Sequence, residues 1–298
     1  MSRDRAQNRR GESMDQETTV DMARADSSRD PGQNLKWCPH YDLSGRTAIV
    51  FGAGSSGSGL SNGEAAARAY AMAGAAVAAV DVNASEAERV AKAIAAAGGM
   101  AIAITADVTD EPQVEAAVHT ATGELGVPDI LHNNVGVART GSVFELGLDA
   151  WDAAVRLNLT SAYLTARHVL PGMLESGRGA IVNVSSTASI RDTGYTYPVY
   201  NATKAGVNQL TVSLALTYAA HGIRANAVLP GLIDTPLVSH QITDDPDALA
   251  ARHAASPTGH MGSSWDVANV SVFLASDAAA YVNGVCLPVD GGLSARCV

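Results

Sequence analysis

The sequence has few cysteines, few basic residues and no long hydrophobic run. Its three cysteines, Cys38, Cys286 and Cys297, lack metal-ligand spacing, and its eight histidines form no paired motif, so we expect a reduced, cytoplasmic protein without a bound metal. Twenty Lys and Arg against 30 Asp and Glu give a net charge of −10. This excludes the basic surface that nucleic acid or an anionic membrane requires. The most apolar stretch, 69–80, is too short to span a bilayer.

The first 36 residues are polar and contain no apolar core of a secretory signal. Their scattered hydrophobic residues follow no period and cannot offset the entropy lost when a chain is ordered. We expect a disordered or loosely docked tail over 1–36 and a single folded domain over 37–298.

Beyond this tail, short apolar runs alternate with alanine-rich stretches. Runs of consecutive hydrophobic residues are typical of strands that are covered on both faces in a parallel sheet. We expect strands at 47–51, 76–82, 101–106, 130–133, 180–185, 223–229 and 284–289, and helices at 64–73, 84–97, 111–122, 148–175, 197–220 and 264–275. This alternation predicts an α/β fold of Rossmann type, a doubly wound parallel sheet of about seven strands.

Two long connections interrupt the pattern, at 186–197 and 230–263. Loops of this length in a compact domain are usually functional. We expect 187–197 and a mobile lid at 237–261 to determine the substrate. Their candidate side chains are Arg191, Tyr195, Tyr197, Leu237, Val238 and His240.

A glycine-rich loop, GAGSSGSGLSNG, joins the first expected strand to the first helix. Composition alone would allow a flexible linker. Its position between strand and helix instead favours a dinucleotide-binding loop, in which backbone N–H groups and the helix N-terminus hold phosphates. We expect Gly52 and Gly63 to frame this site, the Ser55 and Ser56 hydroxyls to donate to the ligand, and Asn62 to contact it.

Asp81 ends the second expected strand, followed by Val82. A carboxylate at this position accepts hydrogen bonds from the adenosine ribose and repels the 2′-phosphate of NADP. No Lys or Arg lies in the glycine loop or directly after Asp81, so the pattern favours NAD. The alternative is a solvated acid at a strand end.

Tyr200 and Lys204 lie four residues apart at the start of an expected helix, on one face. A nearby ammonium lowers the pKa of a phenol and allows it to exchange a proton near neutral pH. The pair alone is weak evidence, because Tyr-x-x-x-Lys also arises by chance.

Taken in order, these motifs resemble the short-chain dehydrogenase/reductase family over residues 43–293. The matching pieces are the glycine loop, Asp81, ADVTD, HNNVG, NLTSAY, IVNVSS, YNATK, NAVLPGLIDTP and GVCLPVDGG.

This resemblance implies a role for each matching residue. Tyr200 would be the general acid/base, Lys204 would tune it and hold the nicotinamide ribose, Ser186 would bind the substrate oxygen, and Asn158 would hold a water that relays protons. The remaining cofactor contacts implied are Asp107, Val108, Asn133, Gly136, Pro230, Gly231, Ile233 and Thr235. Asn133 and Asn158 could instead be buried structural asparagines.

The sequence departs from the family pattern in three places. Phe51 stands where the family usually has threonine, and the glycine loop is about five residues longer than the common form. Ser186 and Tyr200 are 14 positions apart, one more than is usual, which leaves Ser185 as an alternative. Tyr195 and Tyr197 have no lysine four residues later, so we expect them at the substrate mouth.

The resemblance therefore implies an NAD-dependent oxidoreductase that transfers a hydride between NAD(H) and a secondary alcohol or ketone. Two alternatives stay open: non-redox chemistry on the same fold, such as dehydration or epimerisation, and a non-catalytic dinucleotide-binding regulator. The expected partners are a small-molecule substrate and further copies of the chain, in a homotetramer or dimer paired through the helices of Asn158 and Tyr200.

Overall fold

The structure, a computed structural model, describes residues 41–57, 59–236 and 246–296. The expected tail over 1–36 lies outside the described residues, as do the first nine residues of the expected lid, 237–245.

One parallel sheet of seven strands forms the centre of the fold, in the order β3-β2-β1-β4-β5-β6-β9. The strands are β1 (Thr47–Phe51), β2 (Ala76–Asp81), β3 (Ala101–Thr105), β4 (Ile130–Asn133), β5 (Gly179–Val184), β6 (Ile223–Pro230) and β9 (Cys286–Val289). Two short strands, β7 (Ile233–Asp234) and β8 (Gly262–Ser263), pair with each other. The predicted doubly wound sheet is confirmed.

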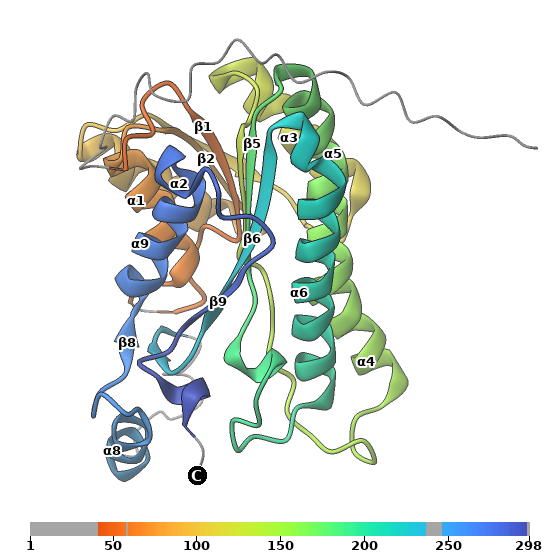
Figure 1. Ribbon diagram of the computed structural model, residues 1–298, viewed down its shortest axis with the longest axis vertical. Coiled ribbons are helices and arrows are strands. Elements are labelled where there is room, and N and C mark those ends of the chain that lie inside the picture. Colours follow the sequence, from red (N-terminus) through yellow and green to blue (C-terminus); the bar gives the residue numbers. More distant parts are fainter. Residues whose placement is uncertain (1–40, 58, 237–245, 297–298) are drawn as a thin grey trace, which may run out of the picture. The chain divides into compact units, whose positions relative to one another are not determined.

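Helices cover both faces of this sheet (Figure 1). On one face lie α1 (Asn62–Met72), α2 (Ala84–Ala96) and α9 (Ser264–Ala275). On the other lie α3 (Glu111–Leu125), α5 (Ser161–Ser176) and α6 (Pro198–Tyr218), with α4 (Leu148–Val155) leading into α5. A further helix, α8 (Pro246–Ala255), follows β7.

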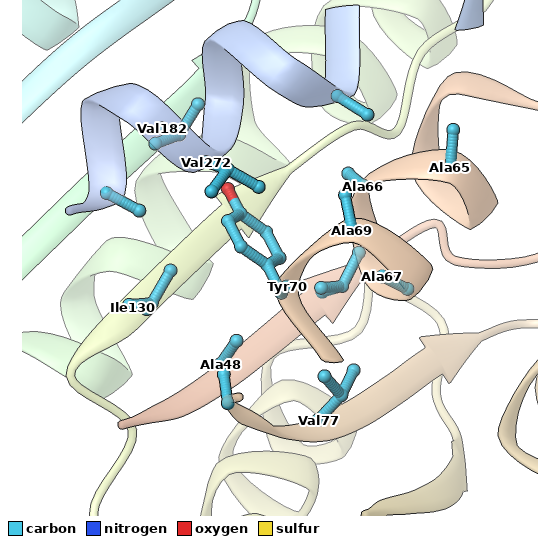
Figure 2. Close-up of a cluster of buried hydrophobic side chains, with 14 of the residues drawn as sticks. Ala48, Ala65, Ala66, Ala67, Ala69, Tyr70, Val77, Ile130, Val182 and Val272 are labelled. Atoms are coloured by element: carbon cyan, nitrogen blue, oxygen red, sulfur yellow. The ribbon is translucent and has the colours of Figure 1, made fainter. Parts of the chain in front are cut away.

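The central strands alternate between the two hydrophobic layers. In β1, Ala48 and Val50 pack under α1 and α9, whereas Ile49 and Phe51 pack under α3 and α5. Since successive side chains of a strand point to opposite faces, a strand buried on both sides reads as a continuous apolar run. Figure 2 shows the first layer, where Tyr70 of α1 lies among small side chains such as Ala48 and Ala69.

The predicted helix over 148–175 is divided in the structure. A π-helical segment, Arg156–Thr160, separates α4 from α5. Its Asn158 accepts a hydrogen bond from the Val137 N–H at 2.8 Å and donates to the Val137 carbonyl at 3.0 Å. Single π-turns inside helices occur often at functional sites. Helix α8 and the strands β7 and β8 were not predicted, because they are short and lack an apolar run.

All seven parallel strands end at the same edge of the sheet, and the chain reverses its winding direction between β1 and β4. Open α/β sheets bind ligands at such a switch point. None of the helices in the described part of the chain is both long and apolar enough to cross a bilayer.

Candidate active site

A cleft of about 800 Å³ runs along this carboxyl edge. Most of the predicted site residues line it: Gly52, Ser55, Ser56, Asn62, Asp81, Val82, Asp107, Val108, Gly136, Ser186, Tyr200, Lys204, Pro230, Gly231, Ile233 and Thr235. Gly63, Asn133 and Asn158 are not among its lining residues. The structure thus gathers segments from nearly the whole domain into one site.

Gly52 and Gly63 lie in direct contact at the base of the glycine loop. A Cβ built on Gly63 would lie 1.9 Å from the Gly52 carbonyl oxygen, so no other residue fits this position. Gly52 has a φ of +79°, which favours glycine. Ser61 caps α1 by accepting from the Glu64 N–H at 3.0 Å and donates to the Gly54 carbonyl at 2.7 Å. These contacts fix the N-terminus of α1 at the cleft, where Ser61 and Asn62 are lining residues.

Two carboxylates hold two consecutive amides of the loop. Asp81 accepts from the Gly54 N–H at 2.8 Å, and Glu86 of α2 accepts from the Ser55 N–H at 3.0 Å. Arg89 joins Glu86 to the buried Glu64 of α1. The hydrogen bonds from Arg89 and the Ser55 amide keep the pKa of Glu86 below its usual value. No sequence motif indicated Glu86, Arg89 or Glu64.

This end of the cleft fits a dinucleotide. Glycines admit close approach of a ligand to the backbone, and the α1 N-terminus favours its phosphates. The Oδ1 of Asn62, at the first position of α1, is buried without a hydrogen-bond partner and lines the cleft. Asp81 also lines the cleft, at the end of β2, where a ribose hydroxyl can donate to it. Ser55, by contrast, donates its hydroxyl to the Gly57 and Gly59 carbonyls within the loop.

Tyr200 lies at the other end, in the first turn of α6. Burial raises the pKa of Tyr200, while a hydrogen bond with Ser186 lowers it. Ser185 does not compete for this role, because its buried hydroxyl donates to the Lys204 carbonyl at 3.0 Å. The structure therefore pairs Ser186, rather than Ser185, with Tyr200.

Lys204 lies one turn further along α6. Its ammonium donates to the Val184 carbonyl at 2.8 Å and lies 5.8 Å from the centre of the Tyr200 ring. Burial lowers the pKa of Lys204 to about 8. The sequence led us to expect a lowered pKa for Tyr200, but in the structure its burial outweighs the contacts that stabilise the phenolate.

Gly136 separates Lys204 from Asn158. A Cβ on Gly136 would lie 2.9 Å from the Lys204 ammonium and 3.4 Å from the Asn158 Oδ1. The side chain of Asn158 is committed to Val137 and to Thr203. Its hydrogen bond to Thr203 nevertheless ties the π-helical segment to α6, the helix of Tyr200 and Lys204.

Asn133, which the resemblance implies as a cofactor contact, has its side chain bonded within the core. Its side chain donates to Asn183 at 2.9 Å and accepts from Thr165 at 2.8 Å. Asn133 is at the end of β4, where the strand alternation turns its side chain into the core between β5 and α5. It is a buried structural asparagine, the alternative that the sequence left open.

Three aromatic rings extend from Tyr200 toward α8. Tyr197 meets Tyr200 edge-on with ring centroids 5.3 Å apart, and Tyr195 stacks on Tyr197 at 5.7 Å. Arg252 of α8 donates to the Tyr195 hydroxyl at 2.7 Å and covers its ring. All of these side chains line the cleft, whereas the candidate Arg191 instead bonds the Ser294 and Ile190 carbonyls. Sequence reasoning missed Arg252, since no motif surrounds it.

Comparison with known proteins places this architecture in a family. Residues 57–294 match the family model described as enoyl-(acyl carrier protein) reductase. The chain is 44% identical over 251 residues to cis-4-hydroxycyclohexanecarboxylate dehydrogenase of Sinomonas cyclohexanicum, covering 84% of this chain and 97% of that protein. It therefore belongs to the short-chain dehydrogenase/reductase family, as the resemblance implied.

Solved structures agree with this assignment. A short-chain dehydrogenase/reductase from Burkholderia xenovorans is 42% identical with a TM-score of 0.81, over 86% of this chain and 99% of that chain. A gluconate 5-dehydrogenase from Burkholderia cenocepacia, in complex with NADP and tartrate, is 33% identical with a TM-score of 0.80, over 87% and 98% of the two chains. The fold is that of the short-chain dehydrogenases/reductases, and the named relatives support an oxidoreductase.

Proposed function

We propose that the protein is an NAD-dependent oxidoreductase acting on a secondary alcohol or the corresponding ketone. The observation that carries the proposal is the Ser186–Tyr200–Lys204 arrangement, which lines one end of the cleft while Asp81 and the glycine loop line the other. When bound, the nicotinamide supplies the hydride acceptor, and the substrate hydroxyl must lose a proton at the same step.

Tyr200 is the group that takes this proton. In the direction of oxidation, its phenolate accepts the hydroxyl proton of the alcohol as the carbonyl forms. Ser186, whose side chain lowers the pKa of Tyr200, orients the substrate oxygen beside it. The ammonium of Lys204 lies 5.8 Å from the centre of the Tyr200 ring, where a positive charge favours the phenolate. Asn158, whose Oδ1 lies near Gly136 as the Lys204 ammonium does, would hold the water that links Lys204 to solvent for proton exchange.

NAD is preferred over NADP in this proposal because the adenosine end is acidic. Asp81 lines the cleft where a 2′-phosphate would lie, and Glu86 is its neighbour across Gly54. The solved relative from Burkholderia cenocepacia holds NADP, so direct competition between the two cofactors is the measurement that decides the preference.

A secondary alcohol is supported by the relatives. One acts on cis-4-hydroxycyclohexanecarboxylate and another on D-threitol, the latter 38% identical over 256 residues. The test is a panel of cyclic and acyclic secondary alcohols incubated with NAD⁺ while absorbance of NADH is followed. Steady NADH formation supports the proposal. Conversion of a substrate with no change in NADH would favour the non-redox alternative.

We further propose a cytoplasmic homo-oligomer, a dimer or tetramer, paired through α5 and α6. Large apolar side chains are exposed along these helices and α4, with Leu216 at 76%, Leu148 at 72% and Tyr163 at 47%. Symmetric pairing would bury them. We propose no catalytic role for the tail over 1–36 and a substrate-gating role for 237–261.

A further inference from the structure

Arg252 is a cation in the substrate end of the cleft whose bonding is incomplete. Its guanidinium has five N–H donors, and among the described residues it donates one hydrogen bond, to the Tyr195 hydroxyl. The Nε is buried without a partner. Among the described residues, no carboxylate forms an ion pair with Arg252. A buried donor left unpaired destabilises the protein unless a ligand completes it.

The side chains around Arg252 indicate the chemical class of that ligand. The guanidinium covers the Tyr195 ring with its carbon 5.4 Å from the ring centroid, and Tyr195 stacks on Tyr197, which contacts the catalytic Tyr200. The positive charge of Arg252 is felt by Tyr197, where it favours the phenolate and opposes the rise in pKa caused by burial. The substrate end of the cleft is therefore lined in order by Tyr200, by the aromatic rings of Tyr197 and Tyr195, and by the positively charged Arg252.

Arginine is suited to bidentate recognition of a carboxylate, because its planar N–H fork matches the two oxygens. We propose that Arg252 binds a carboxylate of the substrate, so that the enzyme acts on secondary alcohols or ketones that carry a carboxylate away from the reacting carbon, joined by an apolar segment that packs on Tyr195 and Tyr197. This inference rests on the proposed function and names the substrate class of the same site.

The first experiment measures binding without turnover. Cyclohexanecarboxylate has the acid and the apolar ring but no hydroxyl, and is titrated by calorimetry into the protein saturated with NADH. We expect Arg252→Leu to weaken its binding by at least about tenfold, the range of a hydrogen bond to a charged group, and to leave NADH affinity unchanged. Equal binding by both proteins, or an equal loss of NADH affinity, would overturn the inference.

The second experiment compares two ring alcohols in NAD⁺ reduction, 4-hydroxycyclohexanecarboxylate and 4-methylcyclohexanol. Arg252→Leu should lower kcat/KM for the carboxylated alcohol through KM, while the neutral alcohol changes less than about twofold. Arg139→Leu is the matched control: it removes the same charge from an exposed position beside Thr140 at the cleft, and should leave the preference intact.

Tyr195→Phe distinguishes two roles of Arg252: binding a substrate carboxylate, or acting as a latch, in which its hydrogen bond to Tyr195 only holds α8 in place. It removes the hydroxyl that accepts from Arg252 but keeps the ring. Carboxylate binding predicts that the preference for the acid survives in Tyr195→Phe, whereas a latch predicts that both variants lose activity on both alcohols alike. Oxidation of the neutral alcohol as efficiently as the acid by the unmodified protein overturns the assignment of Arg252 alone. Absence of oxidation of every alcohol overturns the proposed function instead.

Discussion

The two ends of the cleft differ in the chemical groups that line them. At the glycine-loop end (Gly52–Gly63 with Asp81), the groups offered to a ligand are backbone amides and a helix N-terminus, and side chains mainly hold that backbone in place. At the tyrosine end (Tyr195, Tyr197 and Tyr200 with Arg252), the surface consists of large side chains from two separate segments. A backbone site suits a ligand that never changes, whereas a side-chain site can be altered by single substitutions.

The largest effect should come from breaking the glycine-loop end at its tightest contact. Gly63→Val places a side chain where even a Cβ would lie 1.9 Å from the Gly52 carbonyl. We expect binding of both NADH and NADPH to be lost, measured by fluorescence titration. Gly123→Ala is the control, because a Cβ there meets nothing within 4 Å. Normal binding by a folded Gly63→Val protein, checked by circular dichroism, would refute the packing argument.

This contrast also explains what the sequence could and could not predict. Gly63 and Asp81 belong to contiguous motifs whose spacing is fixed by one strand–loop–helix unit, so their positions follow from local structure. Arg252 and Tyr195 are 57 residues apart, and their contact depends on the path of two long connections. The position of the Asn133 side chain could not be predicted for a third reason. A motif identifies the residue, but the alternation of side chains along the strand decides which face of the sheet that side chain lies on.

The next largest effect should appear at the tyrosine end. Tyr200→Phe removes the proposed proton acceptor but keeps the ring that contacts Tyr197. Turnover should fall by at least about 10²-fold, the usual scale of general acid–base catalysis, with NADH affinity nearly unchanged. The exposed Tyr163, which accepts from Arg167, gives a matched Tyr→Phe control. Near-normal turnover on the best substrate would show that another group transfers the proton.

A smaller effect is expected at Asp81, whose side chain holds the loop and, in the proposed function, accepts from the ribose. Asp81→Ala should reduce the preference for NAD over NADP by about tenfold, because it removes the negative charge that repels the 2′-phosphate. Asp81→Asn removes the negative charge but keeps an acceptor for the Gly54 amide. It therefore distinguishes the effect of the charge on the cofactor preference from the effect of losing the hydrogen bond that holds the loop. The ratio of kcat/KM for the two cofactors is the measurement. Tighter binding of NADP than NAD by the unmodified protein would contradict our interpretation of Asp81.

The smallest effect should come from Glu86. Its carboxylate holds the Ser55 amide next to the amide bound by Asp81, and a Cβ on Gly54 would contact both acidic side chains. Arg89 donates to Glu86 and partly neutralises its charge. Glu86→Gln keeps an acceptor for Ser55 and removes the charge, so it should shift the cofactor ratio toward NADP by only about two- to threefold, within the range of a screened, part-exposed charge. Arg89→Leu should shift the ratio the opposite way, because it exposes the Glu86 charge. A shift as large as that of Asp81→Asn would instead place Glu86 in direct contact with the ribose.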